Sequence, residues 1–141
     1  MSFLTKIFVL FCVFALATAD IWTNCGSSSD HFQIGSVTIT PDPPVKGQDI
    51  TVTANGNLNE EITSGNVKLL VKFGFITILN QNEDLCQAKN PIPCPLQPGA
   101  YNHTITAQIP SNAPSGKYSG NVVVTDQNSQ EVACIDLAFS L

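Results

Sequence analysis

The stretch that decides the fold is VKLLVKFGFITIL, residues 67–79, the most apolar run of the chain after its N-terminal segment. Read with a period of two, one face carries Val67, Leu69, Val71, Phe73 and Phe75, and the other carries Lys68, Leu70, Lys72 and Gly74. Such alternation indicates a half-buried β-strand, with the lysines on the solvent side. Thirteen residues would make an unusually long strand, so we expect Gly74 to bend or bulge it.

Six other segments have strand character. The predicted strands are residues 20–26, 31–40, 49–58, 101–109, 118–125 and 132–141, and residues 80–98 are expected to form a long loop. The clearest is 49–58, in which apolar residues and glycine alternate with Thr and Asn, as in an antiparallel strand with one wet face. Gly35 is a candidate bulge in the second strand, and the prolines of 41–44 end that strand. About seven strands without a helix predict an all-β sandwich.

The first 19 residues resemble a secretory signal peptide. Lys6 is followed by ten apolar residues, 7–16, and by the A-x-A cleavage pattern of residues 17–19. Ten residues are too few to span a bilayer, which needs about 20. We therefore expect a mature chain of residues 20–141 that forms one soluble domain without a membrane anchor.

The charge excludes several classes of partner. The chain has a formal charge of −5 and no arginine, and loss of Lys6 with the signal peptide makes the mature charge −6. Nucleic-acid binding requires clusters of basic residues that neutralise phosphates, so no nucleic-acid partner is expected. A polybasic membrane-binding surface is excluded on the same ground.

Four cysteines remain after cleavage, Cys25, Cys86, Cys94 and Cys134. An even number in a secreted chain implies two disulfides, for which three connectivities exist. We favour Cys86–Cys94, which closes a local loop, and Cys25–Cys134, which ties the first strand to the last. No closely spaced pair suited to zinc is present, so no metal site is expected.

Catalytic motifs are absent from the sequence. No G-x-S-x-G elbow or phosphate-binding glycine loop occurs, and the disulfides consume every mature cysteine. His31 is expected to be a surface turn residue, and His103 to lie inward near a sheet end or cavity mouth. Adjacent carboxylates on a strand point to opposite faces, so the acidic pairs at 60–61 and 83–84 do not make a general acid/base pair by themselves. They are expected to be solvated loop charges. We expect no enzyme activity and no cofactor.

Several short segments in a fixed order resemble a known family. They are WTNCG (22–26), TPDPPVKGQ (40–48), Gly56 and Gly65, Cys86 with CPL (94–96), Pro98-Gly99, Tyr101, SGKY (115–118) and a last strand with Cys134. Together they resemble the ML lipid-recognition domains, and most closely the branch of phosphatidylglycerol/phosphatidylinositol transfer proteins. The family's Niemann–Pick cholesterol-transfer protein has an additional early disulfide loop, whereas this chain has Ser and Asp there.

The resemblance implies an immunoglobulin-like sandwich with a lipid between its sheets, and it supports the same two disulfides. Inward residues that would line the cavity are Val52, Val71, Phe73, Phe75, Tyr101, Ile105, Val122, Val124, Leu137 and Phe139. The same residues would equally fill a packed core, so the expectation of a cavity rests on the family. Lysines in or beside loops, Lys46, Lys89 and Lys117, are the headgroup candidates, and Asn102 in N-x-T is a glycan acceptor.

The predicted function is lipid transfer between membranes by a monomer that touches the membrane transiently, in the secreted or lysosomal/endosomal space. Phospholipid is the first choice of ligand. Sterol binding is the alternative within the class, and an immunoglobulin-like adhesion or recognition module with a packed core is the alternative from another class.

Overall fold

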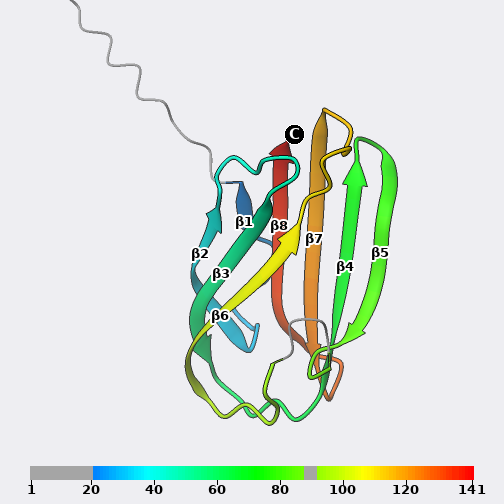
Figure 1. Ribbon diagram of the computed structural model, residues 1–141. Helices are drawn as coiled ribbons and strands as arrows, with labels where there is room; N and C mark the ends of the chain where they lie inside the picture. The colour runs from blue at the N-terminus through cyan, green and yellow to red at the C-terminus, as the bar shows by residue number, and fades with distance from the viewer. Residues whose placement is uncertain (1–20, 88–91) are drawn as a thin grey trace, which may run out of the picture.

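A computed structural model describes residues 21–87 and 92–141 (Figure 1). The predicted signal peptide lies outside these residues, as does Lys89. The described chain consists of strands and loops only. The strands are β1 (Trp22–Asn24), β2 (Phe32–Thr40), β3 (Asp49–Leu58), β4 (Gly65–Phe73), β5 (Ile76–Asp84), β6 (Gly99–Gln108), β7 (Lys117–Asp126) and β8 (Glu131–Ser140). Within these residues, no helix is long and apolar enough to cross a membrane.

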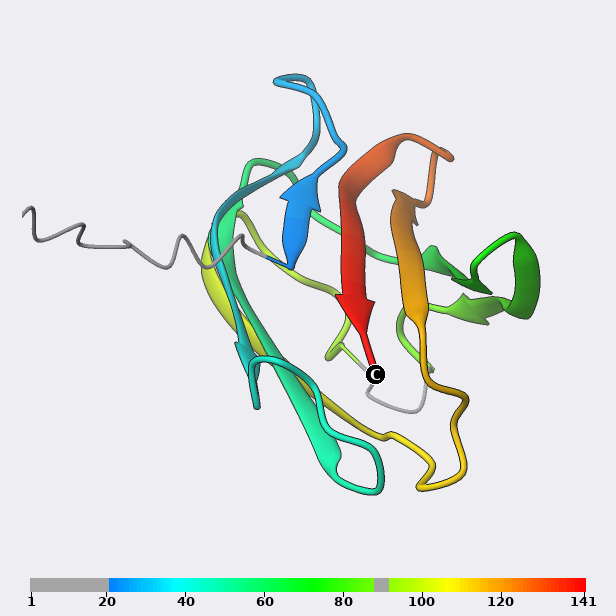
Figure 2. The same cartoon turned by 90° about the horizontal axis from the view of Figure 1, so that it is seen from above.

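Two antiparallel sheets form the sandwich. One has five strands in the order β1-β8-β7-β4-β5, and the other has three in the order β2-β3-β6. Seen from above, the sheets form two layers, with the three-stranded sheet along one side of the molecule (Figure 2). The predicted all-β sandwich is confirmed, and β3 has the predicted bounds.

Residues 67–79, which were expected to form one long strand, instead form a β-hairpin. β4 ends at Phe73, a two-residue turn follows, and β5 returns with Ile76 opposite Phe73. Gly74 has a φ of +57° at this turn, a conformation that side chains with a Cβ rarely adopt. The expected bend is thus a full reversal, which adds an eighth strand. β5 also extends to Asp84, so the expected loop over 80–98 is shorter by its first five residues.

The inner face of the five-stranded sheet follows from its register. Val67, Leu69, Val71 and Phe73 of β4 lie opposite Val124, Val122, Gly120 and Tyr118 of β7. These β7 residues in turn pair with Ala133, Ile135, Leu137 and Phe139 of β8. Lys68 and Lys72 occupy the opposite parity and are exposed, as predicted.

The three-stranded sheet separates its two faces more sharply. Its outer face is polar and includes threonine pairs across β3 and β6, such as Thr53 and Thr104 with hydroxyls 3.0 Å apart. On its inner face Val52 pairs with Ile105, and Leu58 lies further along β3 with the same parity as Val52. Gly35 is the residue at which the β2–β3 register shifts, so the predicted bulge is confirmed.

The close-packed core lies at one end of the sandwich. Leu58, Ile62, Leu85 and Val132 are buried there and contact one another, beside the loop that the Cys86–Cys94 disulfide closes. The second disulfide, Cys25–Cys134, fastens β1 to β8. Both favoured pairings are confirmed, and they indicate an oxidising secretory route.

Candidate functional site

Above this core the two inner faces are only partly covered. In a close-packed sandwich, apolar side chains in the middle of central strands are buried. Here the mid-strand residues on the inner face are half-buried; they are Val52, Leu69, Val71, Val122, Ile135 and Leu137. Solvent therefore reaches the apolar walls between the sheets.

The sandwich is closed along one side and open along the other. Of strands in opposite sheets, β2 and β8 approach most closely. β6 and β5 are the free edges of their sheets on the far side of the strand order. Ile105, on the inner parity of β6, is 39% exposed, and Ile76 of β5 is 64% exposed. Apolar side chains are thus exposed along the β5–β6 side of the sandwich.

The predicted lining residues fall into three groups. Val71, Phe73, Val122, Leu137 and Phe139 share the inner face of the five-stranded sheet, and Val52 and Ile105 lie on the facing sheet. Tyr101 and Val124 pack against the closed core, so they lie at the floor of the space. The prediction for Phe75 is wrong: this side chain is 104% exposed in the turn after β4, because the hairpin reverses the chain there.

Three aromatic rings pack together on the inner face of the five-stranded sheet, at the end away from the close-packed core. Tyr118 lies 5.0 Å from Phe73 and 5.6 Å from Phe139 between ring centroids. Its hydroxyl donates a hydrogen bond to the carbonyl oxygen of Pro114, 2.7 Å away. Tyr118 was absent from the predicted lining residues, although its inward parity is readable from the sequence. It is the buried centre of this aromatic cluster.

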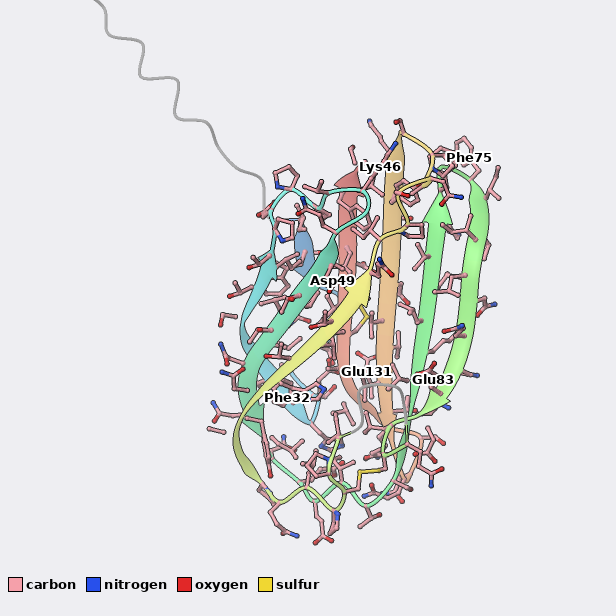
Figure 3. The ribbon with its side chains drawn as sticks, viewed as in Figure 1. Phe32, Lys46, Asp49, Phe75, Glu83 and Glu131 are labelled. Atoms are coloured by element: carbon pink, nitrogen blue, oxygen red, sulfur yellow. A yellow bond between two sulfur atoms is a disulfide. The ribbon has the colours of Figure 1, made fainter. Side chains whose placement is uncertain are left out.

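Lysines gather at the end of the molecule that carries these rings. This hairpin end consists of the β4–β5 turn, the β2–β3 loop and the β6–β7 loop. Lys46 donates to Ser115 Oγ at 2.6 Å, which links the two loops, and Lys117 and Lys72 lie at the adjoining strand ends. Figure 3 shows Lys46 and Phe75 at this end, with Glu83 and Glu131 toward the other.

Carboxylates gather at the other end, which we call the acidic end. It carries seven acidic residues in or beside the loops between β1 and β2, β3 and β4, β5 and β6, and β7 and β8: Asp30, Glu60, Glu61, Glu83, Asp84, Asp126 and Glu131. Among residues 21–87 and 92–141, no lysine lies in those loops. In the described part of the chain, carboxylates are therefore concentrated at this end, whereas the hairpin end carries Lys46, Lys72 and Lys117 together with Asp42 and Asp49.

A compact titratable cluster lies within the acidic end. His31 Nδ1 is 3.4 Å from Glu60 Oε2, and His31 Nε2 is 3.7 Å from Asp126 Oδ2. Hydrogen bonds to the Asn59 and Gln130 amides raise the pKa of His31. His31 is thus more than a surface turn residue, and Glu60 differs from the exposed Glu61 beside it.

The two carboxyls of this cluster shift in opposite directions. The neighbouring Asp126 carboxyl, which would accept a hydrogen bond from a protonated Glu60, and burial both raise the pKa of Glu60. Burial opposes ionisation of Asp126, but the proximity of Glu60 and hydrogen bonds from the backbone amides of residues 130 and 128 outweigh it, so its pKa is lowered. Beside the cluster, burial and a hydrogen bond with Asp30 raise the pKa of Glu131.

Asn102 and His103 occupy opposite faces of β6. Asn102 is exposed on the polar outer face, where a glycan has room, and its glycosylation stays a prediction. His103 pairs with Ala54 on the inner parity, as expected, and is half-buried, but it lies in the middle of β6 and not near a sheet end.

Comparison with known proteins identifies relatives over nearly the whole chain. A family model described as the ML domain matches residues 19–141. A Dictyostelium discoideum protein named for phosphatidylglycerol/phosphatidylinositol transfer is 48% identical over 141 residues, covering 100% of both chains.

Solved structures share the fold at low sequence identity. A Niemann–Pick type C2 protein from the Japanese carpenter ant matches with a TM-score of 0.68 and 12% identity, covering 85% of this chain and 98% of the other. Chicken MD-1, solved in complex with lipid IVa, matches with a TM-score of 0.61 and 22% identity, covering 84% and 87%. These similarities support the two-sheet architecture.

Proposed function

The chain belongs to the ML domain family, and from this premise we propose that it carries a phospholipid between membranes, with the acyl chains held between its two sheets. The relative named for phosphatidylglycerol/phosphatidylinositol transfer makes these anionic phospholipids the first choice of ligand. Extraction and release require no bond to be made or broken, so the proposal includes no catalytic residue.

The observation that carries the proposal is the half-buried apolar inner face above the closed core. Acyl chains placed there would cover walls formed by Val71, Val122 and Leu137 and the facing Val52. Burial of a methylene group stabilises by about 0.8 kcal/mol, so ten methylenes contribute roughly 8 kcal/mol before ordering costs. That magnitude permits binding that is both stable and reversible.

The charge distribution favours one orientation of the ligand. An anionic headgroup would be repelled by the acidic end and attracted by the lysines of the hairpin end. Lys46 and Lys117 are the predicted headgroup residues that lie there, and Lys72 is close to them in the fold. We therefore place the headgroup at the hairpin end and the acyl chains toward the core.

The same end would meet the membrane. Phe75 projects fully into solvent at the tip of the hairpin, and Ile76, Ile78 and Val45 are also exposed. Apolar side chains beside lysines suit the interface of an anionic bilayer. The net negative charge of the chain opposes this docking only in part, because seven of its eleven carboxylates lie at the far end. The membranes would be those of the secretory, extracellular or lysosomal space.

Native mass spectrometry of the purified protein, with lipid identification after organic extraction, tests the proposal. A phospholipid at one per chain would support it. A sterol would move the protein to the sterol-carrying alternative. No lipid, together with no uptake from phosphatidylglycerol vesicles, would leave an immunoglobulin-like adhesion or recognition module.

A further inference from the structure

Two buried oxygen atoms at the acidic end have no hydrogen-bond partner. They are Glu60 Oε1 and Asp126 Oδ2, and in the described part of the chain no other buried side-chain nitrogen or oxygen is unsatisfied. Asp126 is 5% exposed, and its side chain is completely covered. A buried carboxylate oxygen without a partner is costly, so these two oxygens require a proton or a cation between them.

The backbone fixes one of these oxygens in place. Asp126 Oδ1 accepts hydrogen bonds from the amides of Asn128 at 2.8 Å and Gln130 at 2.9 Å in the β7–β8 turn. Because these bonds hold the carboxylate plane, Oδ2 is directed toward His31 Nε2, 3.7 Å away. Glu60 approaches the imidazole from the loop after β3, with its Oε2 3.4 Å from the other ring nitrogen, Nδ1.

The imidazole of His31 is oriented in a way that suits a metal ligand. Its Nδ1 lies 2.9 Å from Asn59 Oδ1, and its Nε2 lies 3.0 Å from Gln130 Oε1. Both contacts are to amide oxygens, so both ring nitrogens donate in the metal-free protein; a cation bound at Nε2 would displace its proton, while Nδ1–H stays on Asn59. A second hydrogen bond that fixes the ring and its tautomer is a regular feature of histidines that bind metals.

We propose that His31, Glu60 and Asp126 bind one divalent transition-metal ion of the zinc or manganese class, with Gln130 Oε1 as an additional donor. The three ligand atoms lie within 4.8 Å of one another. Because two bonds of about 2.0–2.2 Å hold ligand atoms no more than about 4.4 Å apart, metal binding requires these side chains to move together. Glu60 has the freedom to do so because it is half-buried in a loop. One imidazole nitrogen with carboxylate and amide oxygens is a donor set that suits these metals.

The proposed ion would join the two sheets. His31 and Glu60 flank strands of the three-stranded sheet, whereas Asp126 ends β7 in the five-stranded sheet. The site is at the opposite end from the proposed membrane contact. The metal proposal therefore stands independently of lipid transfer.

Metal binding is tested on the protein purified after expression of the full chain, stripped with a chelator and dialysed against Zn²⁺ and, separately, Mn²⁺. We expect saturable uptake of one ion per chain of at least one of these metals, with a rise in Tm. Glu60→Gln should weaken that uptake by about tenfold or more. Glu61→Gln is the matched control, because it removes the same charge from the adjacent, exposed residue, and it should change the affinity less than about twofold.

Histidine ring NMR gives a second readout that does not depend on substitution. Metal addition should shift the ring signals of His31 and leave those of His103 unchanged. The proposal is overturned if neither metal binds at one per chain, if both glutamine variants weaken uptake equally, or if the His31 signals do not move. A proton shared between the two carboxyls would then be what satisfies these oxygens. Asp126 is left unchanged in these experiments because it also holds the β7–β8 turn.

Discussion

Phe73 of β4 and Tyr118 of β7 are directly paired in the sheet, and their rings pack with centroids 5.0 Å apart on its inner face. Phe75, two residues further along, has left the sheet and is fully exposed. The two phenylalanines therefore have separate roles: one packs the interior, and the other is available to a partner outside the molecule.

Truncation of the interior ring should destabilise the fold. Phe73→Ala removes contacts with Tyr118 and with the backbone near Gly116, and we expect a loss of about 3 kcal/mol in the free energy of unfolding. Phe75→Ala is the control and should change it by less than about 0.5 kcal/mol. Urea unfolding of both variants measures the difference, and equal losses would contradict the assigned positions.

Truncation of the exposed ring should weaken membrane contact. Burial of a phenylalanine side chain contributes roughly 1.5–3 kcal/mol, so Phe75→Ala should reduce partitioning onto phosphatidylglycerol vesicles by about tenfold or more. The amount of copurified lipid should stay the same. Vesicle cosedimentation measures the effect.

Two lysines on one strand provide a further control for this docking orientation. Lys72 and Lys68 share the outer face of β4, but only Lys72 adjoins the hairpin tip. Lys72→Gln should weaken binding to anionic vesicles more than Lys68→Gln does. Equal effects would indicate that net charge alone governs the contact.

A bulky side chain between the sheets should exclude the ligand. Val71→Trp places an indole on the inner face, whereas Leu70→Trp places the same group on the outer face of the same strand. We expect the first variant to copurify with several-fold less lipid and the second to retain it. Lipid per folded chain, measured by native mass spectrometry, distinguishes them, and full loading of Val71→Trp would place the lipid elsewhere.

The two disulfides should differ in their contribution to stability. Their cysteines are 109 and 8 residues apart in the sequence. Loop-closure entropy predicts about 4.7 kcal/mol for a 100-residue loop and about 3 kcal/mol for one of 15 residues. Replacing Cys25 and Cys134 by Ser should therefore lower the unfolding midpoint more than replacing Cys86 and Cys94. The reverse order in urea unfolding would contradict this.

Stability should respond to pH through Glu131. Burial and the hydrogen bond with Asp30 raise its pKa above the ordinary 4.5, so the folded state holds this proton more tightly than the unfolded state does. The stabilisation is complete below pH 4.5 and is lost as pH rises through the folded pKa. Glu131→Gln should thus be more stable than the parent at pH 7, with a smaller advantage at pH 4. Urea unfolding in the presence of a chelator measures this, and an advantage independent of pH would refute the assignment.

The strand periodicity and the sandwich are readable from the amino-acid sequence, because they depend on local alternation and on the positions of proline and glycine, which act over short stretches. The even set of cysteines implies two disulfides, but it leaves three connectivities, among which the sequence and the family resemblance only favoured the observed pair. Within the hairpin, the same periodicity correctly placed Val71 and Phe73 on the inner face.

The reversal of the chain at Gly74 and the contacts between distant side chains depend on the complete fold. The alternation continued through Phe75, but a turn with a positive φ removed that residue from the sheet. The separation of lysines from carboxylates, and the contact of His31 with Glu60 and Asp126, depend on which loops share an end of the sandwich. Residues as far apart as His31 and Asp126, which are separated by 95 positions, are brought together by sheet topology, which local sequence patterns do not encode.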